Sequence, residues 1–183
     1  MTKPERLSLS VATAELANPW VRSFRADPYG RVIADRHYNR QAVGSAQFVP
    51  PGRCLVMLTD AADALWVTSW PLAEYVQHDW AGAWMNSCFR NEGEQLSSDL
   101  IRAAVAATLA EWPTPPDLGM VSFVDAGKVR RKRDPGRCYR KAGFKLVGKT
   151  KAGLLAFQML PGEMPEPLAC RERQGRLFDW EAA

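Results

Sequence analysis

Three short groups of residues in this chain carry side chains that could act on a substrate. His37 and Tyr38 are adjacent, Asp125 directly follows a short apolar run, and Tyr139 lies further along the chain. Imidazole, carboxylate and phenol groups are used in proteins to move protons and to hold metal ions. Each group also has a structural interpretation: the His-Tyr pair could end a helix, Asp125 could cap the next turn, and Tyr139 could pack on a sheet.

A second polar group lies between an apolar run and a helical pattern. Arg90 could bind a substrate or cofactor, or it could pair with Glu92 or Glu94. Ser97 and Ser98 come directly before the helical pattern, where serine is a favoured N-cap, although either hydroxyl could also contact a substrate. We therefore keep Arg90, Ser97 and Ser98 as candidates for binding.

A basic cluster gives the chain its uneven charge. The net charge is +4, and five basic side chains fall within six positions: Lys128, Arg130, Arg131, Lys132 and Arg133. Such a cluster on a loop is the electrostatic signature of contacts to a phosphate backbone. A solvated loop and binding of a phosphorylated small molecule remain the alternatives, so charge alone leaves DNA binding at about even odds.

The stretch from Gly119 to Leu160 must position most of these candidates. Residues 120–124 are apolar and predict a buried strand. Asp134 is expected to be the N-cap of a short helix at 137–142, with Pro135 at its first position and Gly143 in a left-handed C-cap. Two closing strands follow, at residues 144–147 and 154–160.

The rest of the chain predicts a mixture of helices and strands. The expected strands are 21–24, 53–59, 64–70 and 83–89, and the expected helices are 31–38, 100–112 and a short one within 170–180. The helix at 100–112 has the clearest apolar periodicity, and Ser97 or Ser98 is its expected N-cap.

The bulk composition indicates one globular domain. With 183 residues, of which 46% are hydrophobic and 24% charged, the chain can bury a core. Its four cysteines are scattered, which favours reduced thiols over disulfides or a zinc site. No apolar run is long enough to span a bilayer, and the first ten residues lack a signal-peptide core, so we expect a cytoplasmic protein in a bacterial cell.

The order of elements predicts an α/β (α+β) fold with a mixed central sheet flanked by helices and at least one parallel crossover through the long helix. Over roughly residues 34–160 this order resembles the GNAT (acyl-CoA N-acyltransferase) fold. In that family a Gly-rich turn before the long helix holds the CoA pyrophosphate on backbone amides. Here the turn at 90–98 has one glycine and two glutamates, which argues against ordinary acetyl-CoA binding.

A narrower resemblance rests on short motifs that occur in a fixed order. They are His37-Tyr38, Arg90-Asn91-Glu92, Ser97-Ser98, Asp125 and Tyr139. At these positions the chain resembles the Mom family of DNA-modification proteins of Mu-like bacteriophages, which are divergent GNAT-like proteins without the usual CoA-binding turn. The resemblance implies an enzyme that converts adenine in DNA to N6-carbamoylmethyladenine and so protects phage DNA from restriction.

The resemblance also implies roles for individual residues. The catalytic set would be His37, Tyr38, Asp125, Tyr139, Arg90 and Ser97; the cofactor-binding set Arg90, Ser97 and Ser98; and the iron ligands Tyr38, Asp125 and Tyr139. Phenolate and carboxylate groups suit iron. The donor of the transferred group, acetyl-CoA or a related molecule, stays open, as does a homodimer.

The proposed domain plan has a leader and first strand at 1–26, a catalytic domain at 27–160 and a tail at 161–183. DNA is the expected partner, and the adenine would have to leave the duplex or be single-stranded. Trp66, Trp70 and Trp84 could stack on a base, although aromatic residues in strands more often lie in the core. Two alternatives remain: a conventional N-acetyltransferase acting on an amine, and a DNA-binding module without catalysis.

Overall fold

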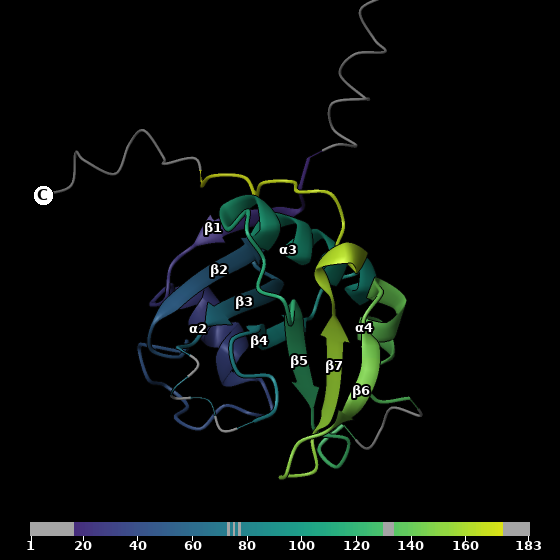
Figure 1. Ribbon diagram of the computed structural model, residues 1–183. Coiled ribbons are helices and arrows are strands. Elements are labelled where there is room, and N and C mark those ends of the chain that lie inside the picture. Colours follow the sequence, from purple (N-terminus) through teal and green to yellow (C-terminus); the bar gives the residue numbers. More distant parts are fainter. Residues whose placement is uncertain (1–16, 73, 75, 77, 130–133, 174–183) are drawn as a thin grey trace, which may run out of the picture.

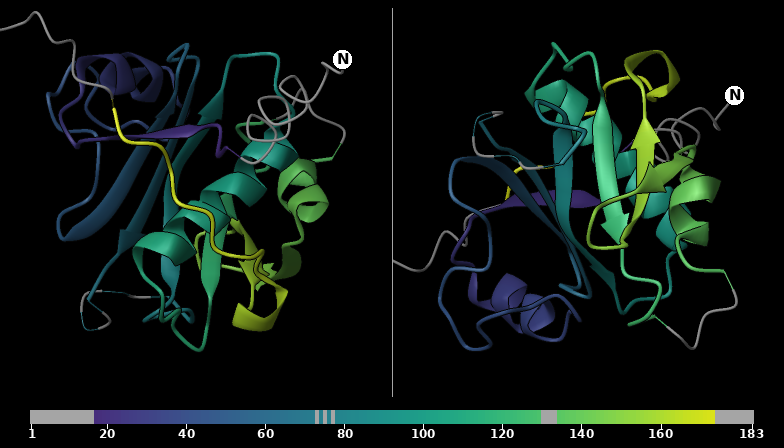
Figure 2. Two further views of the ribbon diagram at one scale, coloured as in Figure 1. Left: turned by 90° about the horizontal axis from the view of Figure 1, so that it is seen from above. Right: turned by 60° about the horizontal axis from the view of Figure 1, so that its bottom comes forward.

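The computed structural model describes residues 17–72, 74, 76, 78–129 and 134–173 (Figure 1). Within these ranges, no helix is both long enough and apolar enough to cross a membrane. The described chain forms one mixed sheet with helices on both of its faces (Figure 2). The helices are α2 (Pro28–Asp35), α3 (Ser97–Glu111) and α4 (Arg137–Ala142), and a 3-10 turn follows at Pro161–Glu163.

The sheet has seven described strands in the order β1-β2-β3-β4-β5-β7-β6. They are β1 (Trp20–Ser23), β2 (Arg53–Thr59), β3 (Ala64–Trp70), β4 (Trp84–Asn91), β5 (Met120–Val124), β6 (Lys145–Lys149) and β7 (Leu155–Met159). β4 and β5 are parallel and are connected through α3, whereas the other described strand pairs are antiparallel. The predicted mixed sheet with a parallel crossover is therefore confirmed.

Two apolar layers hold the helices to the sheet. On one face, Leu100 and Ile101 of α3 pack with Trp66 and Trp84. On the other face, Ile33 of α2 packs with residues of β2 and β3. Each of these side chains is at most 1% exposed, and burial of a large apolar side chain contributes about 1.5–3 kcal/mol. Because Trp66 and Trp84 are fully buried, the suggestion that they could stack on a base was wrong.

Helix α2 begins and ends earlier than its sequence pattern suggested. Asp27 is its N-cap, since its carboxylate accepts hydrogen bonds from the backbone N–H groups of Tyr29 and Gly30. Pro28 takes the first helical position, which its fixed φ angle suits. The helix ends at Asp35, so the predicted helix at 31–38 was wrong at both ends. His37 and Tyr38 consequently lie in the turn after α2.

The other two helices have N-caps that differ from the predicted ones. Leu96 is the N-cap of α3, and Ser97 and Ser98 are its first helical residues rather than caps. The N-cap of α4 is Gly136, with a left-handed φ of 79°, instead of Asp134, which forms an ion pair with Arg140. The predicted left-handed C-cap is confirmed, because Gly143 has a φ of 106°.

The two ends of the described chain meet at the edge of the sheet. Arg171 pairs in parallel with Val21 of β1: its N–H donates to the Trp20 carbonyl, and its carbonyl accepts from the Arg22 N–H. The C-terminal segment therefore covers an otherwise open strand edge. Strand β1, which the domain plan placed in a separate segment at 1–26, belongs to the same sheet as the strands within 27–160. Most of the helix predicted within 170–180 lies outside the described residues; at its start, Cys170 is in an extended segment.

Candidate functional site

A cleft opens where β4 and β5 separate. The parallel ladder between them has three pairs, from Trp84–Met120 to Asn86–Ser122, after which β5 pairs only with β7. Strand β4 continues beside β3 as far as Asn91. The space between the diverging strands belongs to a cleft of about 930 Å³. Six of the predicted site residues line it: His37, Tyr38, Arg90, Ser97, Lys128 and Tyr139.

A β-bulge at Ser87 changes which face of the sheet the side chains of β4 point to before and after it. Val67 is paired with Cys88 and Thr68 with Asn86, so Ser87 is the extra residue. Such a bulge bends a strand and shifts its alternation by one position. Before the bulge, Trp84 packs on the α3 side, and after it Cys88 packs on the α2 side. Because of this shift, Trp84 and Cys88 lie on opposite faces of the sheet although their positions differ by an even number of residues.

His37 and Tyr38 form one wall of the cleft. Their rings stack with centroids 4.4 Å apart at an angle of 27°. Nδ1 of His37 accepts the backbone N–H of Asn39 at 3.2 Å, which leaves the ring proton on Nε2. Burial, followed by the nearby charges of Arg90 and Lys128, lowers the pKa of His37 to about 4. The imidazole is neutral at pH 7 and can donate a hydrogen bond through Nε2.

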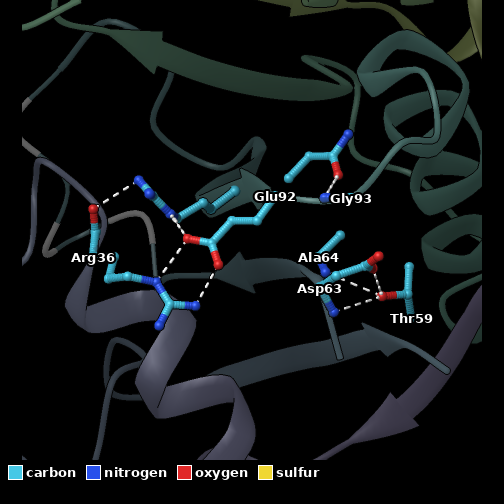
Figure 3. A network of polar contacts seen from close by, with 8 residues as sticks. Arg36, Thr59, Asp63, Ala64, Glu92 and Gly93 are labelled. Atoms are coloured by element: carbon cyan, nitrogen blue, oxygen red, sulfur yellow. Dashed lines mark hydrogen bonds and ion pairs between the residues drawn. The ribbon is translucent and has the colours of Figure 1, made fainter. Parts of the chain in front are cut away.

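An ion-pair network ties the turn that carries His37 and Tyr38 to strand β4 (Figure 3). Arg36 and Arg90 both bind the carboxylate of Glu92, with Nε-to-oxygen distances of 2.7 and 2.5 Å. Arg90 also donates to the backbone carbonyl of Arg36 at 2.7 Å. The bond to Arg36 first, and that to Arg90, lower the pKa of Glu92 to about 2. Arg90 thus has both the predicted ion pair and a place in the cleft.

Tyr139 forms the opposite wall together with a residue that the sequence analysis missed. Its hydroxyl donates to Oδ1 of Asn86 at 2.8 Å, and Ser122 Oγ lies 3.2 Å from the same oxygen. Its ring packs on Phe157, with centroids 5.8 Å apart. Burial raises the pKa of Tyr139 far above its usual value, so the phenol stays protonated. In the sequence, Asn86 stands out as a polar residue within an apolar strand pattern, and this could have marked it as a candidate.

Asp125 and Ser98 lie outside the cleft lining. The Asp125 carboxylate accepts the backbone N–H groups of Gly127 and Lys128 at 2.9 and 3.2 Å, and so caps the turn after β5. Its backbone N–H interacts with the hydroxyl of Tyr38, whose pKa burial raises. Ser98 is hydrogen-bonded to Asp99 at 3.3 Å. Ser97 does reach the cleft, where its hydroxyl accepts from Asn91 at 3.2 Å.

The three residues proposed to bind iron do not fit a resident metal ion as they lie. The Tyr139 hydroxyl donates its hydrogen bond to Asn86, and the Asp125 carboxylate accepts hydrogen bonds from two backbone amides. Burial raises the pKa of both phenols, which disfavours the phenolate that binds iron. Across the described residues, no group of three or more His, Cys, Asp and Glu side chains could hold a metal ion.

Two amides of the turn between β4 and α3 are hydrogen-bonded within the protein. The N–H of Glu92 donates to the Asp63 carbonyl at 2.8 Å. The N–H of Gly93 donates to the Asn91 side chain at 2.9 Å (Figure 3). A Cβ at Gly93 would collide with the Asp63 carboxylate. Position 93 is therefore a glycine because the Asp63 carboxylate lies against it. A carboxylate at this place repels an anion instead of binding it.

Three cations line the cleft: Arg40, Arg90 and Lys128. Each has a carboxylate partner that is not among the described lining residues: Asp35 for Arg40, Glu92 for Arg90, and Asp125, at 4.0 Å, for Lys128. Lys128 begins the basic segment at 128–133, of which Arg130, Arg131, Lys132 and Arg133 lie outside the described residues. The lining cations can contact a ligand that carries negative charge, and their carboxylate partners weaken this attraction.

Comparisons with known proteins do not add to this geometry. No family model, curated protein or solved structure matches the chain. Fold and site define an α/β protein with a mixed sheet and a cationic cleft between two parallel strands.

Proposed function

We propose that this protein is a DNA-modification enzyme that acts on the exocyclic amino group of adenine, as its resemblance to the Mom family implies. The observation that carries the proposal is the cleft lining. His37, Tyr38 and Tyr139 converge there with the cations Arg90 and Lys128. Groups that bind a base and groups that bind phosphate thus share one site.

The size and openness of the site suit a nucleotide. A volume of about 930 Å³ falls within the range typical of clefts that bind small molecules and cofactors. An adenine inside a duplex would be extruded before its amino group could enter such a cleft. Lys128, the first residue of the basic segment, lines the cleft and supplies charge there for the DNA backbone.

The topology supports the transferase part of the proposal. A parallel β4–β5 pair that separates after three residue pairs, with α3 as its connection, is the arrangement expected of a GNAT-like fold. His37 has a neutral imidazole and Tyr139 a protonated phenol, so both can position a substrate by hydrogen bonding. The proposed product is an adenine whose amino nitrogen carries a carbamoylmethyl group in place of one hydrogen.

A conventional acetyltransferase is the second candidate, because the same topology favours it. The turn before α3 argues against it: the Glu92 and Gly93 amides are already paired, and the Asp63 carboxylate lies against Gly93. A DNA-binding module without catalysis is the third candidate. A DNA-binding module without catalysis does not explain why His37, Tyr38 and Tyr139 line one cleft.

Nucleoside mass spectrometry tests these candidates. Plasmid DNA is taken from bacteria that produce the wild-type protein, Tyr139→Phe, or the matched control Tyr29→Phe, whose exposed side chain lies outside the cleft. We expect an adenosine heavier by one carbamoylmethyl group with wild type and with Tyr29→Phe, and much less of it with Tyr139→Phe. Unmodified DNA throughout, together with acetyl-CoA binding in calorimetry, would establish the acetyltransferase instead.

A further inference from the structure

The hydrogen bonds of Asn86 fix the orientation of its side-chain amide. Nδ2 donates to the carbonyl of Val67 at 3.2 Å and to that of Cys88 at 3.0 Å. Both partners are backbone carbonyls, which only accept. The two hydrogens of the amide are therefore used, and a flipped amide would place its oxygen against two other oxygens. Oδ1 is left as an obligatory acceptor, with Tyr139 and Ser122 beside it.

This orientation dictates where the Tyr139 proton lies. Since Oδ1 of Asn86 only accepts, the Tyr139 hydroxyl must donate across the 2.8 Å between them. A phenol has one proton and two lone pairs. Ser122 is close enough to interact with the Tyr139 oxygen as well, but its single proton can fill at most one lone pair. The Tyr139 oxygen thus keeps acceptor capacity for a molecule in the cleft that Tyr139 and Asn86 both line.

The complementary ligand group is a hydrogen-bond donor, because the remaining lone pairs of the Tyr139 oxygen can only accept. A keto oxygen at that position would face a lone pair and be repelled. Arg40, Arg90 and Lys128 line the same cleft, and each has a carboxylate partner, in Asp35, Glu92 and Asp125 respectively. Under the proposed function, the donor that meets the Tyr139 oxygen is the amino group of adenine.

We propose that Tyr139 is the residue that recognises the base amino group by accepting its N–H, and that Asn86 is the positioning residue that holds Tyr139 in this role. The inference rests on the proposed function, because it names how that cleft selects its substrate. It predicts that the site accepts adenine and rejects hypoxanthine, in which a keto oxygen replaces the amino group.

Binding of paired oligonucleotides tests this inference. The probes are short single strands of thymidine with one central deoxyadenosine, one deoxyinosine, or an abasic position, titrated into the full-length protein and followed by fluorescence anisotropy. We expect the adenine strand to bind about tenfold or more tightly than the hypoxanthine strand, because the latter leaves a buried acceptor without its partner. Equal binding of these two strands, both tighter than the abasic one, would overturn the inference and leave the proposed function standing. If none of the strands binds, both fail.

Three variants separate recognition from folding. Tyr139→Phe should bring the adenine and hypoxanthine affinities close to each other. Asn86→Leu should do the same, because the freed hydroxyl can turn and donate to a keto oxygen. Ser122→Ala is the matched control and should keep the preference, since Tyr139 still donates to Asn86. If Asn86 had only a structural role, Asn86→Leu would weaken the binding of the adenine and hypoxanthine strands by the same factor. An unchanged ratio in Tyr139→Phe, which preserves the ring packing, would overturn the inference even if Asn86→Leu does not fold.

Discussion

The guanidinium of Arg90 donates to the backbone carbonyl of Arg36 across 2.7 Å, and so ties strand β4 to the turn that carries His37 and Tyr38. The shared carboxylate of Glu92 strengthens this tie (Figure 3). The two arginines come from segments far apart in the sequence, and only the fold brings them together. The tie therefore fixes the position of the His37–Tyr38 turn relative to strand β4.

Replacement of Arg90 should therefore affect activity more than stability. In Arg90→Met the free energy of unfolding should fall by only about 1 kcal/mol, because the lost contacts are partly exposed. DNA modification should fall tenfold or more, since the His37–Tyr38 turn is no longer held. Urea denaturation and nucleoside mass spectrometry measure the two quantities. Arg102→Met, which loses one long bond of 3.5 Å to Ala142, is the control. Wild-type modification by Arg90→Met would contradict this role.

The sequence predicted the strands better than the contacts between distant segments. The bounds of β2, β3, β5 and α4 were correct, because short apolar or helix-forming runs there end at strong turn residues. The N-caps of α3 and α4 were wrong, because backbone conformation rather than residue preference decides them, whereas the C-cap of α4 at Gly143 was correct. Asn86 was missed as a site residue, because its partner Tyr139 lies on α4, which only the folded sheet brings beside β4.

Acid should destabilise the protein through His37. Its pKa is lowered to about 4 in the folded state from about 6.5, so the unfolded chain binds more protons between these values. The stability due to neutral His37 is therefore complete above pH 6.5 and is lost as the pH falls towards 4. Between pH 7 and pH 5 the loss should be about 2 kcal/mol.

Urea denaturation of His37→Gln at both pH values measures this contribution. The variant should lose less stability than wild type on acidification. His78, whose pKa burial also lowers, acts in the same direction, so the comparison is best made in a His78→Gln background. Glu92 does not interfere, because its pKa is lowered from 4.5 to about 2. The stability that Glu92 contributes is therefore lost mainly below pH 4.5, outside the range from pH 5 to pH 7. Identical pH dependence with and without His37 would contradict the burial of a neutral imidazole.

Gly136 should tolerate no side chain, for two separate reasons. Its φ of 79° is left-handed, and a Cβ there would overlap the ring of Phe157. Gly44 has a similar φ of 82°, but a Cβ there meets no atom within 4 Å. Gly44→Ala should therefore cost about 1 kcal/mol of stability and Gly136→Ala about 3 kcal/mol or more. Equal losses in urea denaturation would show that the Phe157 contact relaxes freely.

Lys128 should contribute to DNA binding through charge alone. It is the first residue of the basic segment, and its side chain lines the cleft and is 55% exposed. Lys128→Gln should weaken binding by a similar factor for every DNA sequence, and should reduce the slope of log affinity against log salt by about 0.7–0.9. Lys151→Gln, in the exposed turn between β6 and β7, is the matched control and should leave the slope unchanged. Equal slopes for the two variants, measured by fluorescence anisotropy over a series of salt concentrations, would place the phosphate backbone away from the cleft.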